Sequence, residues 1–142
     1  MNDMLEIAAE RAALRVLISH WAALDSGNYK AVAAGFAEDG VWHRQGKELK
    51  GPSMVSAAMA ERPKGARTRH IVTNVLSTVK NETEIEIDFY MTVFSHNGEA
   101  GAPLPAPMLL PNSVGLSHAK FRHDGQRWKI EYLKSAPTFQ RK

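Results

Sequence analysis

The fold is decided by the stretch Glu84-Ile85-Glu86-Ile87-Asp88-Phe89-Tyr90-Met91-Thr92-Val93. Apolar side chains occupy every odd position in it, and mostly polar side chains occupy the even positions. A period of two is typical of a strand that buries one face and turns the other toward solvent. The stretch therefore predicts a long, half-buried strand over residues 83–95.

Similar patterns on both sides of this strand predict an antiparallel meander. Residues 69–79 form a strand pattern before it, and residues 114–122 and 127–136 form a pair of strand patterns after it. The dipeptide Asp124-Gly125 lies between the last two, and Asp-Gly is a strong signal for a tight hairpin. A shorter strand is expected at residues 41–43.

The first half of the chain is predicted to be largely helical. Residues 5–24 carry apolar side chains at three- and four-residue spacing, which indicates one buried helix face. A short helix is expected over 29–37 and a third over 54–61, after Gly51-Pro52-Ser53. Helices followed by a meander predict an α+β fold, in which a curved sheet wraps the first helix and encloses a cavity. The apolar positions of the first helix are Leu14, Leu17, Ile18, Trp21 and Leu24.

Composition places the chain in one packed domain, residues 1–142. Of its 142 residues, 44% are apolar and 23% are charged, which are ordinary values for a globular protein. Cysteine is absent, so disulfides and thiolate chemistry are excluded. No apolar run is long enough for a membrane helix and no secretory signal is recognised, so we expect no membrane partner and a cytoplasmic location.

Basic residues gather before position 70, at Arg62, Lys64, Arg67 and Arg69. We interpret this run as a solvated loop, with an anionic ligand attracted to the mouth of a pocket as the alternative. A nucleic-acid surface would need a longer basic stripe with interleaved aromatic residues, so no nucleic-acid partner is expected.

Residues 101–111 contain four prolines and several apolar side chains. Proline cannot donate a ladder hydrogen bond, so this segment is predicted to be an extended loop. Because the loop is apolar, we expect it to pack against the body, cover a pocket opening or contact a second subunit.

Asp25 and His70 are the candidate acid/base pair. Asp25 closes the first helical pattern, and His70 opens a strand pattern. Histidine titrates near neutral pH, and a neighbouring carboxylate can fix its tautomer. Two alternatives stay open: Asp25 could bind turn amides beside Gly27, and His70 could be a satisfied core histidine.

Four segments of the chain resemble the SnoaL-like domain of the nuclear-transport-factor-2-like (NTF2-like) superfamily. The resemblance implies a cone-shaped α+β barrel, N-terminal helices packed in a curved, mostly antiparallel sheet, a homodimer, and chemistry without cofactor or metal. The catalytic patterns are similar to those of scytalone dehydratase and bile-acid 7α-dehydratase. The segments are Trp21–Tyr29, Phe36–Trp42, Arg69–Asn74 and Asp124–Ile130.

The resemblance implies that His70 and Asp25 are catalytic and that His20, where the related pattern has tyrosine, assists them. His20 could instead serve only in packing, and Asn74 could either orient a substrate oxygen or bind backbone. The residues expected to bind substrate are Asn74, Trp21, Trp42, Phe36, Ser117 and Phe121.

These residues predict a small cofactor-independent lyase or isomerase, of dehydratase, ketosteroid-isomerase-like or polyketide-cyclase-like type. It would act on a hydrophobic cyclic substrate in an enclosed pocket. The alternatives are a non-catalytic ligand-binding or assembly module, and the small subunit of an oxygenase.

Overall fold

The structure, a computed structural model, describes residues 1–142 and contains three helices and one six-stranded sheet. The strands follow the order β2-β1-β6-β5-β4-β3; β1 and β6 pair in parallel and all other neighbours are antiparallel. The expected α+β cone with a mostly antiparallel sheet is confirmed, although the sheet stays open rather than closing into a barrel. The elements are α1 (Asp3–Ser26), α2 (Tyr29–Ala34), β1 (Phe36–Arg44), β2 (Lys47–Lys50), α3 (Gly51–Ala60), β3 (Ala66–Asn81), β4 (Glu84–Asn97), β5 (Ser113–His123) and β6 (Trp128–Gln140).

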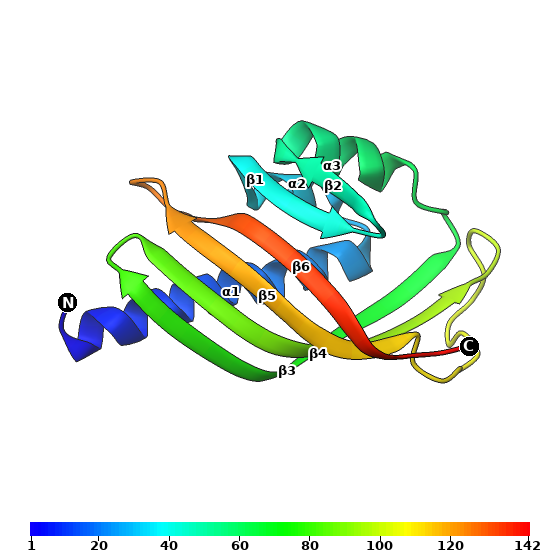
Figure 1. Ribbon diagram of the computed structural model, residues 1–142. Coiled ribbons are helices and arrows are strands. Elements are labelled where there is room, and N and C mark those ends of the chain that lie inside the picture. The colour runs from blue at the N-terminus through cyan, green and yellow to red at the C-terminus, as the bar shows by residue number, and fades with distance from the viewer.

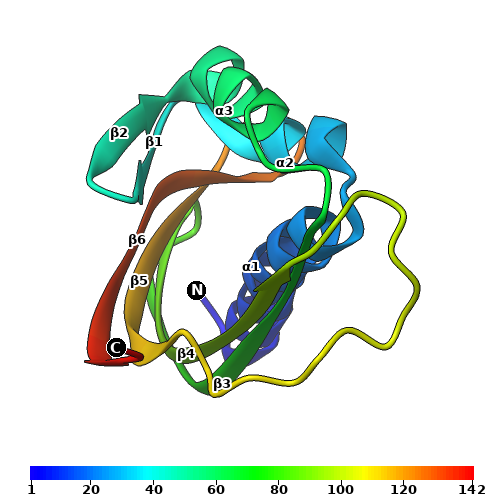
Figure 2. The same cartoon turned by 90° about the vertical axis from the view of Figure 1, so that its right-hand side faces the viewer.

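Helix α1 lies inside the curve of the sheet (Figure 2). It begins at an Asn2 side chain that accepts a hydrogen bond from the Leu5 amide, and it ends at Gly27, which takes the left-handed φ of 79°. Its buried stripe differs from the prediction at Ile18, which is 44% exposed, and at position 20, where a histidine is buried. The buried positions are Ala13, Leu17, His20, Trp21 and Leu24.

The alternation in β4 divides the sheet into a buried inner face and an outer face. Ile85, Ile87, Phe89 and Met91 are buried against α1, as the sequence predicts. Across the sheet, residues opposite one another share a face, so His70, Val93, Ser113 and Gln140 form one row on the inner face.

The region after α1 differs from the prediction in two ways. The second helix stops at Ala34, and Phe36 begins β1 instead of continuing the helix. The reason is tertiary, because the β6 amide of Ile130 donates to Gly35 O and Phe36 pairs with Ile130. Strand β2 was not predicted at all; it pairs with β1 through the turn at Gln45 and Gly46.

The proline-rich segment between β4 and β5 has no regular structure, as predicted, and it arches away from the sheet in Figure 2. Together with β3 and the end of α1 it lines a cavity of about 910 Å³. Leu104, Met108 and Leu110 remain exposed on it.

None of the three helices is long and apolar enough to cross a membrane.

Gly115 on β5 provides a direct test of how closely β5 and β6 pack. A Cβ at this position would collide with Ala136 O and lie 2.7 Å from Pro137 Cα. We expect Gly115→Ala to lower the free energy of unfolding by about 1–3 kcal/mol in urea titrations, because β6 must shift.

Gly35→Ala is the matched control. Its Cβ would lie at ordinary contact distances of 3.6 Å or more, at a helical φ of −73°. The control should be neutral or slightly stabilising. Equal stability of both variants would contradict the close approach of β5 and β6.

Candidate active site

Asp25 and His70 are in direct contact. The His70 ring nitrogen Nδ1 lies 2.6 Å from Asp25 Oδ1, and the His70 backbone amide donates to Asp25 Oδ2 at 2.8 Å. The Thr68 hydroxyl also donates to Asp25 Oδ1, at 2.8 Å. The carboxylate is therefore held at both oxygens by one strand, β3.

Local structure explains why these residues meet. Asp25 lies in the last turn of α1, and Thr68 and His70 share the inner face of β3, which packs against that helix. Asp25 makes no hydrogen bond to the turn amides near Gly27, which was the alternative role. Its side chain is 11% exposed and that of His70 is 10% exposed, so the pair is largely shielded from water.

The environment keeps Asp25 ionised. Burial alone raises the pKa of its carboxyl, but the hydrogen bonds from the His70 ring, the His70 amide and Thr68 outweigh burial and leave that pKa below its ordinary value. A carboxylate only accepts hydrogen bonds, so Nδ1 of His70 is the donor. In the neutral ring Nε2 then carries the free lone pair, which is the arrangement of a general base.

Trp21 fixes the plane of the His70 ring. The two rings stack with centroids 4.5 Å apart and an angle of 21° between their planes. An electron-rich indole face also favours a positively charged partner. Trp21 therefore orients the His70 ring.

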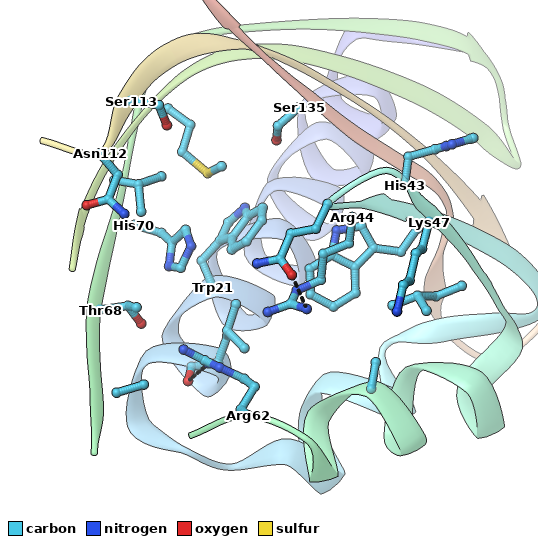
Figure 3. Close-up of a pocket in the computed structure, with 18 of the residues that line it drawn as sticks. Trp21, His43, Arg44, Lys47, Arg62, Thr68, His70, Asn112, Ser113 and Ser135 are labelled. Carbon is cyan, nitrogen blue, oxygen red and sulfur yellow. Dashed lines mark hydrogen bonds between the residues drawn. The ribbon is translucent and has the colours of Figure 1, made fainter. Parts of the chain in front are cut away.

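His70 projects into a cavity of about 650 Å³ between the inner face of the sheet, β1, β2 and the end of α3 (Figure 3). Nε2 of His70 has no hydrogen-bond partner within the protein. The apolar part of the wall includes Trp21, Leu24, Trp42, Leu49, Met91 and Val93. The polar part includes Thr68, Asn112, Ser113, Ser135, Arg44, Lys47 and Arg62.

His20 occupies a different place from the one expected. It is 4% exposed, does not line the cavity, and is enclosed by Trp21, Phe36 and Trp42, with ring centroids 4.5–5.5 Å away. Burial, followed by the nearby charge of His70, lowers its pKa to about 3. Neither ring nitrogen has a partner in the protein. His20 is therefore a neutral core residue without access to a ligand in the cavity.

The expected substrate-binding residues divide into two groups. Trp21 and Trp42 do line the cavity. Phe36, Ser117 and Phe121 are buried and lie behind the wall; the Ser117 hydroxyl lies 2.7 Å from that of Ser135, which does reach the cavity.

Asn74 lies away from the cavity. It is exposed and adopts the left-handed φ of 51° at the bulge where the β3–β4 register shifts. Asparagine tolerates this conformation better than most residues, which accounts for its presence. The bulge, which period-two counting from His70 could not foresee, separates it from the site.

Several wall residues were missed from the sequence. Asn112 follows the proline-rich segment, and Ser135 lies on the last strand, and neither carries a motif. Arg44 could have been found, because it lies two residues after Trp42 on the same strand and so shares its inward face.

A second histidine–aspartate pair in the protein serves as a comparison for the His70–Asp25 pair. His118 Nδ1 lies 2.7 Å from Asp88 Oδ1 on the outer face of the sheet, where both side chains are in contact with solvent. The two pairs have nearly equal Nδ1–carboxylate distances, but His118 Nε2 lies 3.4 Å from Glu86, whereas only His70 faces the cavity. No group of three His, Asp or Glu side chains converges in a way that could hold a metal ion.

A curved sheet around a long helix defines the class of small cone-shaped α+β proteins, and here a shielded histidine–aspartate pair faces the cavity. The SnoaL-like domain family matches residues 5–134. The chain therefore belongs to the SnoaL-like family, and its fold is that of NTF2-like proteins. No curated protein matches it by sequence.

Solved structures share this fold at low sequence identity. A hexachlorocyclohexane dehydrochlorinase, LinA-type3 from Novosphingobium barchaimii, is 12% identical with a TM-score of 0.79, over 99% of this chain and 93% of that chain. A protein from Novosphingobium aromaticivorans that carries the provisional name scytalone dehydratase is 15% identical with a TM-score of 0.78, over 99% and 91%. A protein from Catenulispora acidiphila in complex with S-DNPA is 17% identical with a TM-score of 0.72, over 91% and 92%.

The low pKa of His20 predicts a pH dependence of stability. In the folded protein His20 stays neutral down to about pH 3, whereas in the unfolded chain it takes up a proton near pH 6.5. The unfolded state then binds more protons, so this contribution to stability is complete above pH 6.5 and is lost as the pH falls toward 3.

His20→Leu should remove this dependence. We expect its unfolding free energy, from urea titrations between pH 4 and 8, to fall less steeply below pH 6.5 than that of the wild type, by on the order of a few kcal/mol in all. Above pH 7 the two curves should run parallel, which serves as the internal control. Identical slopes below pH 6.5 would show that His20 is protonated in the folded state.

Proposed function

We propose that this protein is a cofactor-independent lyase or isomerase that uses His70 and Asp25 for acid/base chemistry on a hydrophobic cyclic substrate. The observation that supports this most is the position of His70 Nε2. It belongs to a histidine oriented by a shielded carboxylate, and it faces a cavity whose wall combines apolar with polar and cationic side chains. The cavity, at about 650 Å³, is in the range of small-molecule sites.

In the proposed reaction, His70 Nε2 removes a proton from a carbon next to a carbonyl group. The electron pair of the broken C–H bond moves into the enolate, and Asp25 stabilises the imidazolium that forms. The imidazolium then returns the proton. Return to another carbon gives an isomer, whereas return to a departing β-hydroxyl group gives an alkene and water.

Polar side chains on the wall are candidates to hold the carbonyl oxygen. Ser113 lies in the same row of the inner face as His70, and Ser135 lies on β6. The side-chain oxygen Oδ1 of Asn112 already accepts a hydrogen bond from the Ser95 hydroxyl. The Asn112 amide nitrogen and the serine hydroxyls can donate to an enolate. The names of two structural neighbours, a dehydrochlorinase and a provisional dehydratase, fit elimination chemistry but belong to proteins under 25% identical.

Proton exchange tests the proposal before the substrate is known. A panel of cyclic ketones and β-hydroxy ketones is incubated with the protein in deuterated buffer, and mass spectrometry follows deuterium uptake and loss of water. We expect His70→Ala to lower the rate for any active compound by roughly 10²–10⁴-fold, because the proton acceptor is lost. Asp25→Asn should also lower the rates of deuterium uptake and of water loss.

His118→Ala is the matched control, because it removes a histidine with a similar distance to its aspartate from the outer face. It should leave the exchange rate unchanged. Thermal unfolding of all three variants checks that they are folded. Exchange that survives in folded His70→Ala would refute the assigned base, and His118→Ala with a comparable loss would mean that the cavity is not the site.

We also propose that the outer face of the sheet supports the expected homodimer. Ile71, Tyr90, Leu116 and Phe139 are all at least 44% exposed, and the strand registers put them on that one face. Charged residues of both signs, including Asp88 and His118, lie beside them. Such a mixed surface suits a twofold contact between identical faces.

Leu116→Glu tests the dimer. The side chain is already 50% exposed, so the variant should fold, but a buried carboxylate would oppose association. We expect analytical ultracentrifugation to show a dimer for the wild type and a monomer for the variant. Lys30→Glu, an exposed charge reversal on α2 and away from the outer face of the sheet, is the control and should remain dimeric. A monomeric wild type would refute the proposal.

A further inference from the structure

Three cationic side chains line the cavity that contains His70. Arg44 comes from the end of β1, Lys47 from the start of β2, and Arg62 from the segment after α3. Figure 3 shows Arg44 and Arg62 reaching into the cavity on the side opposite the sheet strand that carries His70. The cavity therefore has a positive side and an acid/base side.

These cations have no carboxylate partner. Glu61 is the single acidic residue on the cavity wall, and none of the three cations forms an ion pair with it or with any other acid. On the outside of the protein Arg122, by contrast, pairs with both Asp39 and Glu131. The positive charge in the cavity is thus available to a ligand.

Arg44 and Arg62 also repel each other. Burial lowers the pKa of the Arg44 guanidinium, and the positive charge of Arg62 lowers it further. Two like charges held at one partly buried site cost free energy, and an anion between them would offset that cost. Their arrangement therefore favours a negatively charged ligand.

Both guanidinium groups are held in place by aromatic rings. Arg44 lies 5.5 Å from the centre of the Trp42 ring, and Arg62 lies 5.6 Å from that of Tyr29. Arg62 also donates to the Leu24 carbonyl at 3.3 Å, and Arg44 donates to the Gln45 side chain at 3.4 Å. Each contact uses one N–H group and leaves the others free, which suits the forked geometry that binds a carboxylate.

The same cavity also has an apolar part of its wall. Trp21, Trp42, Met91 and Val93 belong to it. A ligand that fills it would have an apolar ring system against these residues and a charged group at the arginine side. The distance between the two ends then decides which carbon lies at His70.

We propose that the substrate is an organic anion, an apolar ring compound whose carboxylate binds between Arg44 and Arg62 and so presents its reactive carbon to His70. The presentation to His70 rests on the proposed function; the carboxylate site does not. This inference extends the expected hydrophobic substrate to an amphiphilic acid. It also gives the basic residue Arg62 the anion-binding role that was the alternative interpretation of the sequence.

Pairs of acids and amides test the site by binding alone. Calorimetry on the full chain measures benzoate, 2-naphthoate and anthracene-2-carboxylate, each against the neutral amide of the same shape. We expect at least one acid to bind about tenfold or more tightly than its amide, since hydrogen bonds to charged groups are the stronger ones. Arg44→Gln and Arg62→Gln should each remove most of that preference and leave amide binding within about twofold.

Arg127→Gln is the matched control, because Arg127 is exposed on the β5–β6 hairpin, away from the cavity. It should keep the full preference. If no acid binds more tightly than its amide, or if the double variant Arg44→Gln/Arg62→Gln keeps the preference, the proposal is wrong. Thermal unfolding confirms that the variants are folded.

The same measurement on His70→Ala separates the two proposals. Preference for the acid that persists in His70→Ala supports the carboxylate site whatever the outcome of the exchange assay. Loss of the preference in His70→Ala, with Arg44 and Arg62 intact, would overturn the assignment of the anion to the arginines. A failure of proton exchange in the wild type counts only against the acid/base function.

Discussion

The Asp25 carboxylate joins the end of α1 to the inner face of β3, and the geometry of the candidate active site depends on that connection. Three donors, from the His70 ring, the His70 amide and the Thr68 hydroxyl, bind its two oxygens. The same contacts that fix the helix against the strand also select the tautomer of His70. One charged group therefore has a structural and a chemical consequence, because a shielded carboxylate is stable only where its lone pairs are satisfied.

The second condition for the site is the curvature of the sheet. Strands β3 to β6 bend around α1, and α2 and α3 lie over one end of the curve (Figure 2). Since each strand alternates its side chains, the inner face packs α1 at one end and lines the cavity at the other. The His118–Asp88 pair has a similar contact between the two side chains, but its ring lies on the outer face beside Glu86 and not against the cavity. The chemistry proposed for His70 thus depends on its location as much as on its partner.

The aromatic residues connect the two ends of the cavity. Trp21 stacks on His70, Trp42 lies beneath Arg44, and the two indoles lie 6.1 Å apart in an edge-to-face arrangement. Behind them the buried His20 fills the space between the rings. His70 and Arg44 are therefore positioned by neighbouring aromatic rings, which lie between them.

The sequence by itself determined the main helices and strands and which of their faces are buried. The period of two in β4, the helical spacing around Leu17 and Trp21, and the Asp124-Gly125 turn are local signals, because they follow from the geometry of one segment. They were enough for the α+β fold and for naming Asp25 and His70. The tertiary structure decided the contacts between segments. It made Phe36 a strand residue through pairing with β6, it buried His20, it moved Asn74 out of the site by a bulge, and it brought Arg44 and Arg62 to one wall. These results depend on residues far apart in the chain, and no local pattern encodes the distance between them.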